Sequence, residues 1–335
     1  MVIFPTLAVG LLASLAVGVA VGPVAISPGE SLRIILAQLG LGGVGALDAA
    51  HRLIITQIRL PRALTGALIG LILGLSGTVM QGIFRNPLAS PYLLGIASGA
   101  SAGAALVIVL HWQLGGMGLP LGAFLGSTLA VISVYRLGMR AGRTSPYGLI
   151  LAGIALGALF SALTSFLITL SSGTQLREIV FWLMGGLGRS NWHYLRLLTP
   201  VALGGAALVF ALSRDLNALA LGETGARHLG IEPEQLRRFL LALVTLLTGA
   251  AVAISGTIGF VGLITPHALR LIVGPDHRLL LPATALAGAA FLVLSDTLAR
   301  TLLSPVELPV GIITAFVGAP FFLYLLVSSR PEGSI

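Results

Sequence analysis

The sequence contains no cysteine and no lysine, so all 19 of its basic side chains are arginines. The absence of cysteine excludes a disulfide scaffold and any thiolate metal site. The absence of lysine excludes a P-loop, whose lysine reaches the phosphates of a bound nucleotide, and it excludes Schiff-base catalysis. The chain therefore carries no ATP-binding motif of the P-loop type.

Charge of either sign is also scarce. Only 9% of the 335 residues are charged, against roughly 25% in an ordinary soluble domain. Hydrophobic residues make up 56%, and the mean hydropathy is +1.02. A water-soluble globule could not bury that much apolar surface, so a soluble protein is excluded. The net charge of +8 does not indicate nucleic acid, because the arginines are scattered between apolar segments as at the aqueous ends of membrane helices.

Apolar runs predict an all-α polytopic membrane protein with about ten transmembrane helices in one domain over residues 1–335. The expected spans are 3–22, 63–82, 92–110, 119–136, 147–170, 194–213, 239–255, 258–273, 282–300 and 309–328. The first of them could instead be a cleaved signal peptide, but its apolar run is long for one. It lacks a basic region in front, and we expect a retained helix.

Three stretches are not expected to span. Residues 23–58 are the longest polar stretch and predict an outer loop with an interfacial helix. Residues 174–190 are apolar but too short to cross, which indicates a re-entrant or interfacial segment. Residues 214–238 predict two short helices separated at Gly222 and ended at Gly230.

Ten crossings place both termini on one side of the membrane. With the amino terminus inside, eleven arginines fall in inner loops and eight in outer loops, the usual direction of the bias. We therefore expect both termini to be cytoplasmic. Four-residue glycine ladders in the second and third spans, Gly66-Gly70-Gly74 and Gly95-Gly99-Gly103, predict close helix packing within one bundle.

The centres of the predicted spans lack the acidic side chains that would couple transport to an ion gradient. An ion-coupled secondary transporter needs acidic groups at the span centres, and the nearest candidate, Asp296, lies near an end with Arg300 four residues on. An intramembrane enzyme needs a nucleophile and a base within reach, and no convincing pair is present. A separate ATPase bound to the 214–238 loop is the remaining powered option, although an ordinary solvated loop is the alternative interpretation of that segment.

Several ordered motifs resemble the permease subunits of binding-protein-dependent ABC importers for iron-siderophores, haem and cobalamin, the FecCD type. They are Arg59-Leu60-Pro61-Arg62, Arg85-Asn86-Pro87-Leu88-Ala89, Leu219-Ala220-Leu221-Gly222-Glu223, Gly259-Phe260-Val261-Gly262-Leu263-Ile264 with Pro266-His267, Asp276-His277-Arg278, and Glu307-Leu308-Pro309. The similarity extends from about residue 55 to 328.

The resemblance implies a homodimer of ten-helix subunits with the translocation path on the two-fold axis. It implies two cytoplasmic ATPase subunits, which bind ATP and Mg, against Leu221, Gly222, Glu223, Arg227 and Gly230. It also implies one periplasmic or lipid-anchored binding protein that docks through Arg59, Arg62 and Arg300. Membrane lipid surrounds the chain, which would hold no cofactor or metal of its own and do no covalent chemistry.

Three further expectations concern the path and its cargo. The loop 137–146 would form a cytoplasmic gate, with Thr144 and Ser145 as its residues, again by resemblance. Trp182 and Met184 in the short outer segment would line the outer pore mouth, or would simply be interfacial anchors. The expected cargo is an iron chelate, a ferric siderophore or haem, with cobalamin as the alternative. The expected location is a bacterial or archaeal cytoplasmic (inner) membrane.

Overall fold

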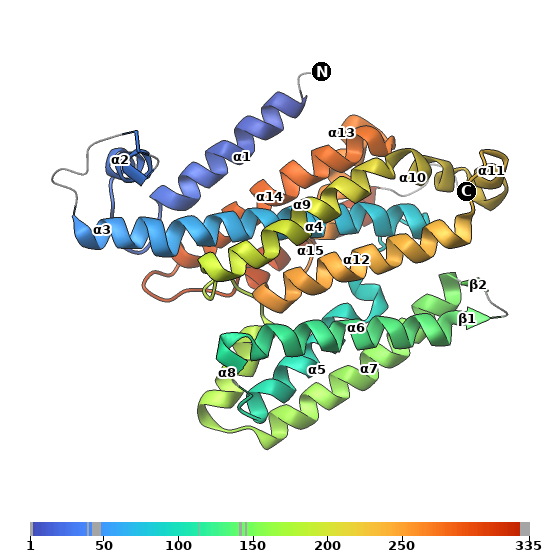
Figure 1. Ribbon diagram of the computed structural model, residues 1–335, viewed down its shortest axis with the longest axis horizontal. Coiled ribbons are helices and arrows are strands. Elements are labelled where there is room, and N and C mark those ends of the chain that lie inside the picture. Colours follow the sequence, from blue (N-terminus) through green and yellow to red (C-terminus); the bar gives the residue numbers. More distant parts are fainter. Residues whose placement is uncertain are drawn as a thin grey trace.

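The computed structural model of the protein is a bundle of helices that run roughly along its long axis (Figure 1). It describes residues 3–38, 40–41, 48–112, 114–140, 143–144 and 146–328. Within these ranges seven helices are long and apolar enough to cross a membrane, and three more apolar helices are shorter. Together they match the ten predicted segments, which confirms an all-helical integral membrane protein.

The ten apolar helices are α1 (Ile3–Ala20), α4 (Leu60–Phe84), α5 (Ile96–Val109), α6 (Gly118–Gly138), α7 (Pro146–Leu170), α9 (Trp192–Ala211), α12 (Pro233–Ser255), α13 (Val261–Val273), α14 (His277–Thr301) and α15 (Val310–Ser328). The other elements are α2 (Pro28–Gln38), α3 (Ala49–Leu53), η1 (Ile54–Arg59), η2 (Pro91–Leu94), η3 (Leu114–Gly116), β1 (Met139–Arg140), β2 (Arg143–Thr144), α8 (Gly173–Leu183), α10 (Ser213–Ala220) and α11 (Gly222–His228).

The second span is longer than the sequence predicted. A continuous helix of 36 residues runs from Ala49 to Phe84, so the last part of the expected outer loop 23–58 belongs to it, and the predicted start at residue 63 was wrong. The continuity is hidden by Pro61, which lacks a backbone N–H. Just before Pro61 the backbone hydrogen bonds of the helix change to the wider π-type spacing. The N–H of Leu60 donates to the carbonyl of Ile55, five residues earlier.

The glycine ladders pack helix against helix, as predicted. On α4 a Cβ at Gly70 would lie 2.2 Å from the carbonyl oxygen of Gly288 on α14. On α5 a Cβ at Gly99 would lie 2.4 Å from the carbonyl oxygen of Gly126 on α6. Only glycine permits these backbones to approach so closely, so the ladders fix which helices become neighbours.

Two of the ten apolar helices begin part-way along their predicted spans. Gly95, with φ +74°, separates η2 from α5, and the non-helical residues 256–260 separate α12 from α13. The two breaks meet, because the Tyr92 hydroxyl donates to the carbonyl oxygen of Ile258 at 2.8 Å. Irregular backbone at this depth is tolerated when protein groups satisfy its polar atoms.

The bundle has two ends that differ in structure. We call the end that carries α3, α8 and the α14–α15 connection the Arg62 end, on the left of Figure 1. We call the end that carries α10, α11, β1 and β2 the Glu223 end, on the right. The last residue of α1, Ala20, contacts Arg59 at the Arg62 end, and Glu307, which lies three residues before the start of α15, contacts Arg62 there. Both terminal helices therefore extend from there toward the opposite end.

Candidate functional sites at the two ends of the bundle

The Arg62 end contains a buried cluster of charges drawn from distant parts of the chain. The Arg62 guanidinium donates to Asp296 through Nε at 3.0 Å and Nη2 at 2.9 Å, and to Glu307 through Nη1 at 2.9 Å. Asp296 also lies 3.7 Å from Nε of Arg300, which is the i,i+4 pair expected from the sequence. Because Arg presents a planar fork of donors, one guanidinium satisfies two carboxylates at once.

The other two predicted docking arginines bind the end of α1. Arg59 donates to the carbonyl oxygens of Val19, Ala20 and Val24, and Arg300 donates to that of Gly18. The last carbonyls of a helix have no partner within it and carry its negative partial charge. The two cations therefore cap α1 and attach it to α4 and α14.

This placement affects the predicted role of the three arginines. Arg59 and Arg300 are each 3% exposed and Arg62 is 7% exposed. Of their two carboxylate partners, Asp296 is buried but the side chain of Glu307 is 44% exposed. The docking role remains a prediction, and Glu307 is the only one of these two acids that an approaching protein could replace without opening the core.

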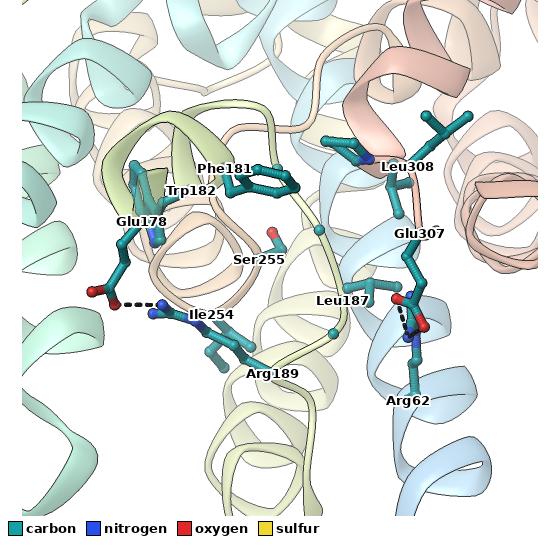
Figure 2. Close-up of a pocket in the computed structure, with 15 residues that line it drawn as sticks. Arg62, Glu178, Phe181, Trp182, Leu187, Arg189, Ile254, Ser255, Glu307 and Leu308 are labelled. Atoms are coloured by element: carbon teal, nitrogen blue, oxygen red, sulfur yellow. Dashed lines mark hydrogen bonds and ion pairs between the residues drawn. The ribbon is translucent and has the colours of Figure 1, made fainter. Parts of the chain in front are cut away.

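A solvent-accessible cleft of about 230 Å³ lies next to this cluster (Figure 2). Arg62 and Glu307 form one wall, and the ion pair of Arg189 with Glu178 forms the other. Phe181 lies across its top and Arg177 stacks on the ring at 5.4 Å from its centroid. Sequence reasoning missed Glu178, Arg189 and Glu307 as cleft residues, because no local pattern brings positions so far apart together.

The two residues predicted for the outer pore mouth differ in position. Trp182 lines the cleft and packs into the core with 7% exposure, whereas Met184 is exposed and is not among the cleft's lining residues. The segment 174–190 was predicted to be interfacial or re-entrant, and it forms the short helix α8 followed by a loop. That loop joins the break before α13 through hydrogen bonds from Gly186 N–H to Ser255 O and from Thr257 Oγ1 to Leu183 O.

At the Glu223 end, residues 214–238 form the two short helices that the sequence predicted. α10 and α11 are separated at Gly222, with φ +94°, and α11 ends before Gly230, with φ +80°. Leu216 and Leu219 of α10 are buried and anchor the pair to the bundle. In contrast, Leu221 is 70% exposed and Leu229 is 61% exposed, which leaves an apolar, rigidly held surface.

The charged residues predicted for coupling lie on the same projection. Glu223 accepts a hydrogen bond from Arg237 of α12 at 3.1 Å, and Arg227 pairs with Glu232 at 3.5 Å. These pairs lock α11 onto the start of α12. We name the exposed surface of α10 and α11, with Leu221, Glu223 and Leu229, the knob.

A second set of bonds ties α10 to the first turn of α14. The Asn217 side chain accepts from the backbone N–H of His277 at 2.9 Å and donates to Asp276 at 2.6 Å. Asp276 also accepts from the side chain and backbone of Arg278, and these bonds hold the pKa of Asp276 well below its usual range. A movement of α10 would thus pull directly on α14, whose other end carries Asp296.

The predicted gate loop 137–146 is described only in part. β1 and β2 pair antiparallel, with Met139 opposite Thr144. Ser145 lies outside the described residues. Among the described residues there is no group of three or more His, Cys, Asp and Glu side chains that could hold a metal ion.

The sequence matches the FecCD transport family over residues 9–328. It is 47% identical to the cobalamin import system permease protein BtuC of Halobacterium salinarum, over 82% of this chain and 73% of that one. It is 43% identical to the hemin transport system permease protein HmuU of Yersinia pestis, over 90% of this chain and 95% of that one.

Solved structures agree with the fold. A chain described as an inward-facing conformation of a metal-chelate type ABC transporter superposes with a TM-score of 0.85 at 37% identity, over 97% of this chain and 99% of that one. PsaBC from Streptococcus pneumoniae shares the fold more distantly, with a TM-score of 0.56 at 18% identity over 78% of this chain and 88% of that one. The chain belongs to the FecCD transport family, and its named relatives identify the helical bundle as a transport permease.

Proposed function

We propose that the chain is the permease subunit of an ABC importer that takes up an iron chelate, haem or a ferric siderophore, delivered by an external binding protein. The similarity to a hemin permease over nearly the full length of both chains supports this cargo, as does the likeness to a metal-chelate type transporter. Cobalamin is the second candidate, because the relatives at 47% and 44% identity are named cobalamin or vitamin B12 permeases.

The knob is the observation that carries the proposed mechanism. Two large apolar side chains, Leu221 and Leu229, are exposed at the two ends of α11, which is attached to the bundle through buried Ala226 and the ion pair of Glu223 with Arg237. Such a surface fits a groove on a partner protein. We propose that two ATPase subunits bind there, one per permease copy, and that ATP binding and hydrolysis in them move α10, α11 and α14 as rigid bodies.

The same scheme assigns an orientation. The Glu223 end would face the cytoplasm together with both termini, in a bacterial or archaeal inner membrane. The Arg62 end would face outward and receive the binding protein. A partner carboxylate would bind Arg62 in place of Glu307, and charge complementarity would orient the carrier over the path.

The path itself would lie between two copies of the chain. α7 exposes Leu151, Ile154 and Leu159, and α15 exposes Phe316 and Leu323. We propose that these two helices of each copy face the two-fold axis. An apolar lining binds cargo weakly and allows it to leave, so that affinity resides in the binding protein. Thr144 and Ser145 remain the proposed cytoplasmic gate.

Uptake by reconstituted vesicles tests the proposal. Vesicles that contain the permease with its ATPase subunits and binding protein should accumulate haem or a ferric siderophore only when ATP is inside. Cobalamin and the two iron chelates are compared at equal concentration with the same components. Uptake by the permease alone would contradict the ATP-driven scheme, and transport of cobalamin only would replace the favoured cargo by the second candidate.

A further inference from the structure

A second large hollow lies on the side of the bundle where α6 and α12 lie side by side (Figure 1), and it extends to the Glu223 end, where Met139 of β1 lines it. It is a groove of about 700 Å³, open on one side. Its walls are almost wholly apolar and include Phe124, Val131 and Ile132 of α6 with Leu241 and Leu246 of α12. Ile132 and Leu246 are nearly half exposed, so the groove opens onto the outer surface of this chain.

The polar groups of the groove gather at one end. Arg136, near the end of α6, and Arg238, near the start of α12, line it there. Both lie toward the Glu223 end, because α12 starts directly after the knob. The groove therefore has an apolar length and a cationic head.

The net charge at that head is positive. Arg238 donates through Nε to Glu234 at 2.9 Å, and Arg237 also contacts Glu234 at 3.4 Å and Glu223 at 3.1 Å. Arg136 adds one more cation, which forms no ion pair within the part of the chain that the structure describes. Three arginines against two carboxylates leave a charge of +1, which matches one phosphate monoanion.

The length of the groove matches one leaflet of a bilayer. From Phe124 to Arg136 the helix α6 advances twelve residues, or about 18 Å at 1.5 Å per residue. Half of the hydrocarbon core is about 15 Å. A ligand with a charged head at Arg136 would reach the middle of the membrane beside Phe124.

We propose that this groove binds an anionic glycerophospholipid of the leaflet at the Glu223 end, with its phosphate at Arg136 and Arg238 and an acyl chain between α6 and α12. Basic pockets between membrane helices commonly hold anionic head groups on that side. The bound lipid would fill the space between α12, which follows the knob, and α6, which leads to β1 and the gate loop. This inference goes beyond the proposed transport function and uses only the proposed orientation, in which the Glu223 end faces the cytoplasm.

The test compares two lipids of identical acyl chains, phosphatidylglycerol and phosphatidylcholine. The full-length protein is reconstituted in bilayers containing both, released in mild detergent, and its bound lipids are counted by native mass spectrometry. Phosphatidylglycerol should be retained at least about fivefold over phosphatidylcholine, the factor that one basic residue near an anionic lipid contributes. Equal retention of the two lipids, or retention of neither, would overturn the proposal.

Variants locate the lipid. Arg136→Gln should abolish the preference, whereas Arg214→Gln, which removes an exposed arginine at the same end outside the groove, should keep it. Ala242→Trp fills the groove with its charges intact and should reduce the retention of both lipids, while Ala13→Trp on the exposed face of α1 should not. The assignment would be overturned if phosphatidylglycerol were still retained in both Arg136→Gln and Ala242→Trp. It would also be overturned if haem displaced the lipid competitively.

Discussion

Arg62 and Asp296 are 234 positions apart in the sequence, yet three hydrogen bonds of 2.9 to 3.1 Å join them inside the bundle. The pair connects α4 to α14 directly, at the end where Glu307 provides the second carboxylate. A buried ion pair of this geometry costs much to desolvate, and removing one partner leaves the other charge buried and alone.

The first prediction concerns the stability of this pair. Arg62→Met should lower the free energy of unfolding by about 3 kcal/mol or more, because Asp296 remains charged and buried. Adding Asp296→Leu should recover part of that loss. The recovery should be incomplete, since Arg300 then loses its own partner. Thermal unfolding of the wild type, Arg62→Met and the double variant in detergent measures the difference, and no recovery in the double variant would argue against a pairwise interaction.

The second prediction tests the role of Glu307 at the outer surface. If a carboxylate of the binding protein takes its place on Arg62, then Glu307→Gln removes an internal competitor and should tighten binding of that protein. Arg62→Gln should weaken binding by about tenfold, and raised salt should shrink both effects. Glu178→Gln, which alters the opposite wall of the cleft, is the matched control. Surface plasmon resonance gives the affinities, and an unchanged affinity in Arg62→Gln would remove Arg62 from the docking site.

The third prediction separates two glycines in long helices. Gly70→Ala places a methyl group on the carbonyl of Gly288, and we expect a loss of about 1–3 kcal/mol from overpacking. Gly204→Ala on α9 has open space around the new methyl and should be neutral or stabilising by up to about 1 kcal/mol. The melting temperatures of the two variants are measured in the same detergent. Equal shifts from the wild type would refute the packing argument.

The fourth prediction tests the knob. Leu229→Ser should weaken the association of the ATPase subunits by about tenfold or more without lowering the melting temperature, because Leu229 is exposed. Leu114→Ser changes an equally exposed leucine at the other end and should leave association unchanged. Co-purification at several protein concentrations measures the effect. Normal association of the Leu229→Ser variant would place the ATPase contact elsewhere.

The fifth prediction follows from Asp276, whose pKa is lowered chiefly by hydrogen bonds from the Arg278 side chain. A group with a lowered pKa in the folded state contributes stability above its unfolded pKa of about 3.9, and that contribution is lost as the pH falls below it. We therefore expect no loss from this site between pH 7 and 5 and a decline below about pH 4. Asp276→Asn should flatten the decline, as measured by melting temperature against pH, and an unaltered decline would exclude Asp276 as its source.

Much of the fold followed from local pattern. The ten apolar runs predicted the ten apolar helices, and the glycine ladders predicted the close helix packing. The turn residues Gly222 and Gly230 predicted the limits of the two short helices of the knob. The start of the second span was missed because Pro61 reads as a helix boundary, whereas a local π-type turn carries the helix past it.

The sequence alone determined that this chain lies in a membrane, lacks a P-loop and carries a charged segment at residues 214–238, because hydropathy and residue type need no neighbours to act. Only the tertiary structure decided that Arg59 and Arg300 cap α1, that Arg62 lies between Asp296 and Glu307, and that a cationic groove opens between α6 and α12. These contacts depend on which helices pack together. The hydrogen bonds among them join residues from 35 to 282 positions apart, and contacts over such separations leave no periodicity in the sequence.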